Sequence, residues 1–257
     1  MIMKIYFLTF GGPTSEYHHA VERICKQAET FGLFYKVVGL TERDLQNDAE
    51  LWLKHNDFIN SNSRGYGYWL WKPYIIKKTL ASMDDGDVLL YADCGCELNY
   101  AGKSKLLDLI NQVKIKNIIG TSAASTDTSY TKMDLTTHLQ MENNIDLLKQ
   151  NQMAATTLLM VKNELIVDLI NEYYEISSNN YHLIDDTPSV ENNFCDFIEH
   201  RHDQSVFSLL VKKYGLKNYD LDPLYLGGVE SKQNYINNGM EYPIWTCRNK
   251  TGVSIQL

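Results

Sequence analysis

The first forty residues constrain the fold more strongly than any other part of the sequence. Residues 4–10 form an apolar run of strand length, which a Gly-Gly-Pro turn interrupts. Apolar residues then recur at the helical period until Gly32, and residues 33–38 form a second apolar run. A strand, a tight turn, a helix and a second strand make a βαβ unit, which implies parallel strands joined by a right-handed crossover. The sequence therefore predicts an α/β fold with a mostly parallel central sheet flanked by helices.

Residues 86–98 read GDVLLYADCGCEL and form the second informative stretch. A short apolar run between turn residues is typical of a buried strand. Asp93 directly follows this run, at the edge where open α/β sheets bind ligands, and the Gly-Gly-Pro turn belongs to the same edge. Asp93 is therefore a candidate for a chemical role. The alternative is that Asp93 only begins a turn, because Asp and Gly favour turns for local reasons.

Residues 63–76 combine glycines and aromatic residues with two cations, Arg64 and Lys72. Pro73 suits the first turn of a helix, where its missing N–H costs nothing, so a helix is expected over residues 73–83. The aromatic loop before this helix is expected to be either a hydrophobic plug beneath the sheet or a wall of a ligand pocket.

The rest of the chain continues the alternation of helices and strands. Leu53 and Leu165 are expected to face the core, and Asp203 is expected to be the N-cap of its helix. The polar residues 181–193 are predicted to form a long loop, and such loops are often functional lids. The other expectations are helices over 41–59, 103–113, 163–176 and 203–215, strands over 117–120, 153–161, 219–226 and 242–245, loop-like segments over 56–62 and 122–130, and an otherwise irregular tail from residue 233.

The overall composition limits the classes of protein that the chain can represent. With 257 residues, 44% of them apolar, and no linker-like segment, we expect one domain over residues 1–257, with the weakest patterns from about residue 216. A net charge of −8 argues against a nucleic-acid partner, although a small phosphorylated ligand needs only a few local groups. No segment is long enough to span a membrane and no signal peptide is recognisable, so we expect a cytoplasmic protein and leave peripheral membrane association open.

The five cysteines lie at irregular spacing, which indicates a reducing compartment without a disulfide framework. Cys94 and Cys96 form a C-x-C pair beside Asp93. No second pair of Cys or His residues has the spacing of a zinc site, so zinc is not expected there.

Three stretches together resemble the GT-A glycosyltransferases, which use nucleotide sugars and have a Rossmann-like α/β domain. They are GYGYWLWKPYII at residues 65–76, GDVLLYADCGCEL at 86–98 and HRHDQSVFSLL at 200–210. The resemblance covers roughly residues 4–215. The combination of the three stretches is similar to a group of bacterial and viral sugar transferases of polysaccharide or glycan assembly. It implies transfer of a sugar from a nucleoside diphosphate donor, a reaction in which charge grows on the leaving phosphate oxygens.

In that family a divalent cation, Mn²⁺ or Mg²⁺, stabilises the leaving diphosphate and binds an Asp-x-Asp motif after a sheet strand. Asp93 matches the first acid of this motif, and Gly95 stands where the second acid would be. The resemblance thus implies Asp93 as the metal contact, with Glu97 as a helper, and leaves metal dependence open. The carboxyl-terminal histidine of many relatives has no match, because the last histidine is His202. Cationic partners for the diphosphate are therefore more attractive: Arg64, Lys72 and Lys132.

The resemblance also suggests the remaining site residues. Asp203 would act either as a general base toward the acceptor or as a ligand of sugar hydroxyls, and Gln204 would bind the donor sugar. Lys132, Gln152 and His202 are candidates for the acceptor or sugar side. The loop after the first strand would bind the nucleoside through Thr9, Phe10, Gly11 and Gly12.

The leading hypothesis is a glycosyltransferase that moves a hexose or similar sugar from a nucleotide-sugar donor to a glycan or lipid-linked acceptor. The missing second acid keeps a second hypothesis open, a non-catalytic carbohydrate- or nucleotide-sugar-binding protein on a degenerate GT-A scaffold. A nucleotidyltransferase shares the sheet topology, but it usually carries a basic glycine-rich loop near the amino end, which TFGGPTSEYHH lacks.

Overall fold

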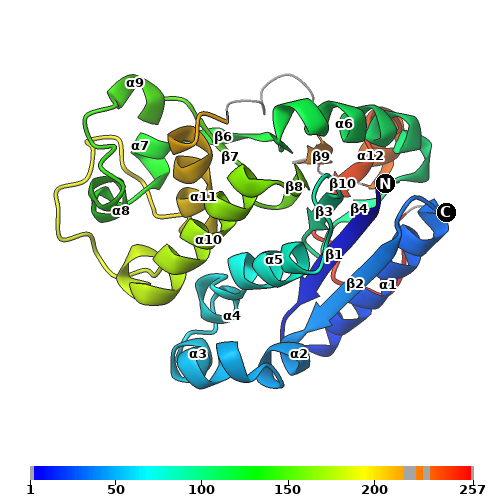
Figure 1. The fold of residues 1–257 in the computed structure, drawn as a ribbon, viewed down its shortest axis with the longest axis horizontal. Helices are drawn as coiled ribbons and strands as arrows, with labels where there is room; N and C mark the ends of the chain where they lie inside the picture. Colours follow the sequence, from blue (N-terminus) through cyan, green and yellow to red (C-terminus); the bar gives the residue numbers. More distant parts are fainter. Residues whose placement is uncertain (1–2, 217–223, 228–231, 256–257) are drawn as a thin grey trace.

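A five-stranded sheet runs through the centre of the protein (Figure 1), in a computed structural model that describes residues 3–216, 224–227 and 232–255. Its strands are β1 (Ile5–Gly11), β2 (Lys36–Thr41), β3 (Val88–Ala92), β5 (Ile118–Ile119) and β8 (Thr157–Val161), in the order β2-β1-β3-β8-β5. β1 pairs in parallel with β2 and β3, whereas β8 pairs antiparallel with β3 and β5. The predicted mostly parallel sheet is confirmed, with β8 as its reversed strand.

The βαβ unit forms as predicted, with one shift of a boundary. Helix α1 (Ser15–Phe31) follows β1 and ends at Gly32, whose φ of 64° is the left-handed conformation that glycine tolerates best. The second strand begins at Lys36 instead of residue 33, because its pairing with β1 begins where Lys36 lies opposite Tyr6. Leu33 and Phe34 pack instead against the core beside α1. Their apolar character reflects this packing and not strand pairing.

The side chains of the sheet alternate between two apolar cores, as the period of a strand requires. Phe7, Leu90 and Leu159 belong to the core shared with α1 and α6 (Lys103–Lys116). Leu8 and Tyr91 face the other core, which contains α5 (Trp71–Ala81), α10 (Glu164–Asn179) and α11 (His202–Lys213). Helices therefore cover both faces of the sheet, and helices α7, α8, α9 and α11 lie in the left part of Figure 1.

The helix expected over residues 41–59 divides into α2 (Glu42–Gln46) and α3 (Ala49–Ser61). Thr41 and Asp44 form the expected capping box, and Asp48 caps α3 through the Glu50 N–H. The break changes the helical phase, so Leu53 is 81% exposed and the prediction that it faces the core is wrong. The loop expected over residues 56–62 is also wrong, because α3 continues to residue 61.

Residues 65–69 form a left-handed turn, which includes the element labelled α4 (Gly65–Tyr68) in Figure 1. All five residues have positive φ, between 51° and 83°. The Tyr68 N–H donates to the Arg64 carbonyl at 2.8 Å, and the Trp69 N–H donates to the Gly65 carbonyl at 3.2 Å. A left-handed residue other than glycine costs about 1–2 kcal/mol, so the three aromatic residues here store strain. The helix after this turn begins at Trp71, two residues before Pro73.

Other boundaries also differ from the predictions. Residues 122–130 form a strand and a helix instead of a loop, and the strand expected over residues 153–161 divides in two around residues 154–156. Leu165 is 37% exposed instead of buried, although Asn163 caps α10 as expected. The elements here are η1 (Tyr100–Gly102), β6 (Ser122–Thr126), α7 (Asp127–Tyr130), α8 (Met133–His138), α9 (Ile145–Leu148), β7 (Asn151–Met153), paired with β6, and η2 (Tyr181–Leu183), which begins the otherwise irregular segment 181–193.

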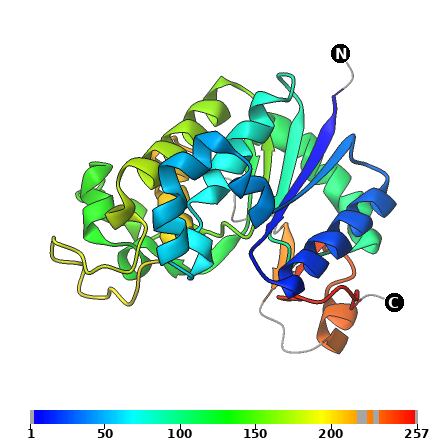
Figure 2. The same cartoon turned by 90° about the horizontal axis from the view of Figure 1, so that it is seen from below.

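The carboxyl-terminal part is more ordered than its sequence suggests. β9 (Tyr225–Gly227), β10 (Ile244–Thr246) and β4 (Glu97–Leu98) form a small sheet, and α12 (Lys232–Asn238) lies where an irregular tail was expected. The strand expected over residues 219–226 falls largely outside the described residues. Figure 2 shows the last described residues, drawn in red, beside α1. No helix in the described ranges combines the length and apolarity that crossing a membrane requires.

Candidate functional site

Three charged side chains from separate elements meet at the carboxyl edge of the sheet. Lys72 lies in the first turn of α5, Asp93 follows β3, and Asp203 is the second residue of α11. The Lys72 ammonium lies 2.7 Å from Asp203 Oδ2 and 3.4 Å from Asp93 Oδ1. It also donates a hydrogen bond to the Ala155 carbonyl at 3.3 Å. A buried cation therefore joins the two carboxylates for which the sequence predicts catalytic roles.

The first turn of α11 leaves the Asp203 carboxylate free to make this contact. The N-cap position is held by Arg201, so the predicted capping role of Asp203 is wrong. The backbone carbonyl of Asp203 accepts a hydrogen bond from the Tyr173 hydroxyl at 3.1 Å, which ties the start of α11 to α10. A tertiary ion pair with Lys72 has replaced the local capping bond that residue type alone suggested.

Each charge in this group depends on the others. Burial alone would lower the pKa of Lys72, but the Asp203 and Asp93 carboxylates outweigh that effect and raise it. Burial raises the pKa of Asp203, and the Lys72 ammonium opposes this rise. Because a buried charge is tolerated only when it is paired, Lys72 is the group that keeps Asp203 ionised.

The two carboxylates differ in their access to solvent. The Asp93 side chain is 36% exposed, whereas the Asp203 side chain is 10% exposed. Asp93 Oδ1 accepts a hydrogen bond from the Tyr91 hydroxyl at 2.6 Å, in addition to the contact with Lys72. Asp93 Oδ2 is therefore the oxygen best placed to meet an incoming ligand.

Gln204 and Gln152 lie together beside this group. Gln204 Nε2 donates to Gln152 Oε1 at 2.8 Å, and Gln152 is completely buried. Gln204 is half-buried and directly follows Asp203 in the chain. Of these two predicted site residues, only Gln204 is directly accessible to a ligand.

The residues near Asp93 fit a protein-bound divalent cation poorly. Among the described residues, no three His, Cys, Asp or Glu side chains cluster as a metal site would require. Gly95, at the place of the second acid, packs against the backbone of Arg248, with 3.4 Å from a Cβ built at Gly95 to Arg248 Cα. Burial raises the pKa of Cys94 to about 12, so its sulfur stays a thiol and suits a metal poorly. The Asp93 carboxylate is accessible, and the Lys72 ammonium lies 3.4 Å from it.

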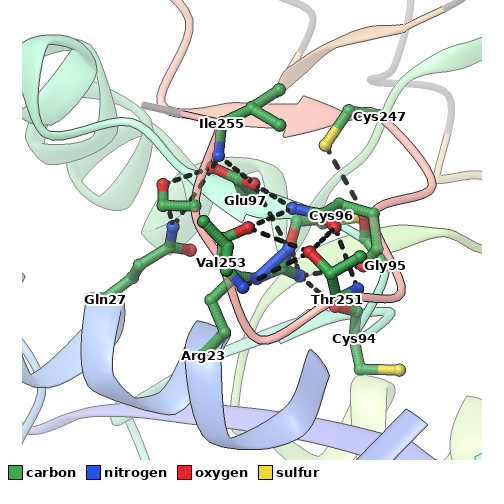
Figure 3. A network of polar contacts seen from close by, with 12 residues as sticks. Arg23, Gln27, Cys94, Gly95, Cys96, Glu97, Cys247, Thr251, Val253 and Ile255 are labelled. Carbon is green, nitrogen blue, oxygen red and sulfur yellow. Dashed lines mark hydrogen bonds and ion pairs between the residues drawn. The ribbon is translucent and has the colours of Figure 1, made fainter. Parts of the chain in front are cut away.

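Glu97 is not available as a metal helper, because its carboxylate is bonded to α1 and to the carboxyl-terminal residues (Figure 3). Its fully buried carboxylate accepts hydrogen bonds from Arg23 Nη1 at 3.2 Å, Gln27 Nε2 at 3.2 Å and the Ile255 N–H at 2.9 Å. Arg23 Nη2 also donates to the Cys94 and Cys96 carbonyls at 2.7 and 2.9 Å. The ion pair thus fixes the backbone on the carboxyl side of Asp93.

The same ion pair holds residues 247–255, which we call the tail segment. Arg23 Nη2 donates to the Asn249 carbonyl at 3.1 Å, and the Asn249 N–H donates to the Gly95 carbonyl at 2.8 Å. This places the exposed Lys250 with its ammonium 4.8 Å from the ring centroid of Tyr17, near the amino end of α1. A hydrogen bond with Tyr17 raises the pKa of Lys250. Nothing in the sequence near Lys250 indicated this position, which only the tail segment creates.

Arg64 and His202 meet through Asp186 in the 181–193 segment. Arg64 Nη1 lies 2.8 Å from Asp186 Oδ1, and His202 Nε2 lies 3.5 Å from the same oxygen. The His202 ring stacks on Trp69 of the left-handed turn with 5.5 Å between ring centroids. Arg64 therefore pairs with an exposed acid at the rim and does not join the Lys72 group.

Lys132 also contacts the 181–193 segment. Its side chain is 3% exposed, and its ammonium donates to the His182 carbonyl at 2.7 Å and to Asp185 Oδ1 at 3.0 Å. The Lys132 ammonium is therefore paired with groups of the protein itself and holds the 181–193 segment in place.

The predicted nucleoside loop is shaped largely by packing. Thr9 and Phe10 are buried, and the Phe10 ring lies 4.0 Å from the ring of Trp71 by centroids. A Cβ at Gly11 would lie 2.7 Å from the Tyr17 carbonyl oxygen, so glycine is required there for α1 to approach β1. Gly12 has ordinary space around it, 3.8 Å to the Tyr17 ring, and it is the more accessible of the two glycines.

Comparison with known proteins identifies this architecture. A solved structure described as a glycosyltransferase involved in the glycosylation of the major capsid of PBCV-1 matches with a TM-score of 0.52 and 10% identity, covering 98% of this chain and 95% of the other. The fold is that of a GT-A glycosyltransferase. Mouse xyloside xylosyltransferase 1 in its apo form gives a TM-score of 0.48 at 10% identity, with 98% and 100% of the two chains covered.

The match in structure has no counterpart in sequence. No protein-family model and no curated protein sequence matches the chain. At 10% identity the GT-A likeness establishes the fold, and the chemistry has to be argued from the residues themselves.

Proposed function

We propose that this protein is a glycosyltransferase that moves a sugar from a nucleoside diphosphate donor to a glycan or lipid-linked acceptor. The observation that carries the proposal is the group formed by Lys72, Asp93 and Asp203. It lies at the carboxyl edge of a GT-A sheet, where α/β folds bind ligands. A buried ion pair is costly to keep, so its position at this edge favours a chemical role over a purely structural one.

The roles follow from access and charge. Asp93 and Gly12 lie at the more open side. We assign Asp93 to hydroxyl groups of the nucleotide sugar and Gly12 to its nucleoside, with the exposed Lys250 as a cation for the phosphate oxygens. Asp203, the more buried carboxylate, either accepts a proton from the acceptor hydroxyl or bonds the hydroxyls of the transferred sugar. Lys72 keeps Asp203 charged for either role.

A divalent cation is at most an auxiliary in this proposal. In the part of the chain that the structure describes, the groups around Asp93 do not include the carboxylates that would hold Mn²⁺ or Mg²⁺ without the substrate, whereas Lys72 and Lys250 already provide positive charge. We therefore expect nucleoside diphosphate binding to survive removal of divalent cations by a chelator, with weaker affinity. Complete loss of binding in chelator would show that a cation is indispensable.

A second function deserves a test because Gly95 replaces an acid of the family motif: binding of a nucleotide sugar or carbohydrate without turnover. The two functions differ in whether nucleoside diphosphate is released from the bound sugar. Binding without release, together with an Asp93→Ala variant that changes only affinity, would favour the second function.

Thermal unfolding with a panel of uridine, guanosine, thymidine and cytidine diphosphates tests both functions at their shared step. A ligand at 100 times its Kd stabilises by about 2.7 kcal/mol, which raises the Tm of a chain of this size by roughly 5–10 °C. Asp93→Asn should reduce this shift, whereas Asp85→Asn, at a side chain that is 86% exposed, should leave it unchanged. No shift with any member of the panel would refute nucleotide-sugar binding.

A further inference from the structure

A second fully buried ion pair lies at the carboxyl end of α11. The Lys212 ammonium contacts Asp127 Oδ2, and both side chains are 0% exposed. Lys212 also donates to the Gln150 carbonyl at 2.9 Å. Asp127 begins α7 and Lys212 lies in the last turn of α11, so the pair ties the two helices together. The Lys72 group contains neither residue, and the pair has no contact with solvent.

The Asp127 oxygen that does not contact Lys212 sets the orientation of the Gln152 side-chain amide. Gln152 Nε2 lies 3.1 Å from Asp127 Oδ1 and 3.1 Å from Thr131 Oγ1. An ionised carboxylate only accepts hydrogen bonds, so the NH₂ end of Gln152 has to face Asp127 and its oxygen has to face away. The Thr131 hydroxyl donates to the same Asp127 oxygen at 3.3 Å, so the carboxylate also directs a Thr131 lone pair toward the NH₂ end of Gln152. The Tyr130 carbonyl, 3.4 Å from Gln152 Nε2, is a weaker acceptor for the same end.

The orientation passes from Gln152 to Gln204. Gln152 Oε1 accepts the hydrogen bond from Gln204 Nε2 at 2.8 Å, which commits the NH₂ end of Gln204 to the protein interior. Among the described residues, nothing donates a hydrogen bond to Gln204 Oε1. This oxygen therefore remains for a ligand, one residue after Asp203.

We propose that Asp127 is a positioning residue that acts through Gln152 to present the carbonyl oxygen of Gln204, and not its NH₂ group, to the transferred sugar. The ligand group that fits this oxygen is a hydrogen-bond donor, a sugar hydroxyl. The inference rests on the proposed function, because it assigns the polarity of one contact in the same site. Lys212 keeps Asp127 ionised and so preserves the direction of the chain of amides.

The test uses two double variants that remove both buried charges and so leave neither unpaired. Asp127→Leu with Lys212→Met removes the acceptor that orients Gln152, whereas Asp127→Asn with Lys212→Met keeps an acceptor oxygen at that place. We expect the Leu double variant to lower the turnover of nucleotide sugar by about 10- to 100-fold, with the Kd for nucleoside diphosphate within about twofold of wild type. The Asn double variant should recover most of the turnover. Equal turnover in the two double variants would overturn the proposal.

Two further measurements keep the test decisive. If the double variants do not fold, Gln152→Met interrupts the relay and leaves the ion pair intact; unchanged turnover in this variant would overturn the proposal. If wild-type protein releases no nucleoside diphosphate, the proposed function fails. The orientation of Gln204 by Asp127 is then tested by measuring ligand binding. The Leu double variant should then bind nucleotide sugar more weakly relative to nucleoside diphosphate, and the Asn double variant should not. An unchanged ratio of the two Kd values in both double variants would contradict the role of Asp127.

Discussion

Two buried ion pairs support the two sides of the Lys72 group, and they do so in different ways. Arg23 and Glu97, with side chains 3% and 0% exposed, lie behind Asp93. Asp127 and Lys212, both 0% exposed, lie at the carboxyl end of α11, and Asp127 connects through Gln152 to Gln204, the residue after Asp203. Each pair is shielded from solvent. In each pair, one charged side chain also forms hydrogen bonds with groups outside the pair, the Arg23 guanidinium in the first and the Asp127 carboxylate in the second.

The difference lies in what those remaining groups hold. Arg23 donates to main-chain carbonyls, those of Cys94, Cys96 and Asn249, so this pair fixes the path of the backbone and of the tail segment. Asp127 accepts from a side-chain amide, so the second pair fixes the orientation of Gln152 in addition to holding the Gln150 carbonyl through Lys212. We infer that the first pair sets where Asp93 stands, and the second sets which atom of Gln204 is presented.

The largest effect on stability should come from breaking the Arg23 pair. Glu97→Gln leaves the Arg23 guanidinium buried without its counter-charge, and the loss of one partner from a buried pair costs about 3–5 kcal/mol of unfolding free energy. Urea unfolding measures this change. Glu172→Gln is the matched control, because its pair with Lys213 is 41% and 25% exposed and should contribute less than about 1 kcal/mol. Equal losses in the two variants would contradict the assigned role.

The next effect concerns the cation that connects the two sides. In Lys72→Met, burial and the nearby Asp93 both favour protonation of Asp203, so its pKa rises further than in the wild type and a larger fraction of the carboxyl group is protonated. We expect turnover at pH 7 to fall by roughly 100-fold and to recover in part as the pH is raised. Lys78→Met, at a side chain that is 53% exposed, should retain the wild-type profile. A pH-independent loss in Lys72→Met would argue against control of Asp203 ionisation.

The smallest effect separates the two sides by their response to acid. Burial lowers the pKa of His200 from 6.5 to about 3, and its ring connects the Lys132 N–H to the Leu183 carbonyl near the start of α11. Between these pKa values the unfolded state binds more protons than the folded state. The stabilisation is therefore complete above pH 6.5 and declines as the pH falls toward 3.

Hydrogen exchange between pH 7 and pH 4 can follow this decline. We expect amides of residues 181–204 to lose protection before those of residues 93–98. His200→Gln should reduce the dependence of stability on pH in this range. Simultaneous loss of protection in both segments would show that the two sides do not respond independently.

Local patterns predicted the elements and the edge of the site, and they failed where distant residues decide the outcome. Asp93 and Lys72 could be placed at the carboxyl edge because each adjoins a predicted strand or helix start. Asp203 has the residue type of an N-cap, but Lys72, far away in sequence, offers its carboxylate a stronger partner. Capping preference is a local effect of about 1 kcal/mol, and the tertiary ion pair outweighs it.

The supporting pairs could not have been found from the sequence. Arg23 and Glu97 are 74 residues apart, and Asp127 and Lys212 are 85 residues apart. Lys212 lies near the end of the helix predicted over residues 203–215, and Asp127 lies in a segment of small polar residues that was predicted as a loop. Only the folded topology brings these charges together and shows that they are buried.

Release of nucleoside diphosphate from a panel of nucleotide sugars, compared between wild type and Asp203→Asn, tests the central claim most directly. The side chain of Asn is close in size to that of Asp and cannot carry the charge that pairs with Lys72. We predict that wild-type protein releases nucleoside diphosphate from at least one sugar donor when acceptor glycan is present. Asp203→Asn should bind the same nucleoside diphosphate, but it should liberate nucleoside diphosphate from the sugar donor at least about 100-fold more slowly. Release by Asp203→Asn at the wild-type rate, or no release by wild type from any donor that it binds, would contradict the account.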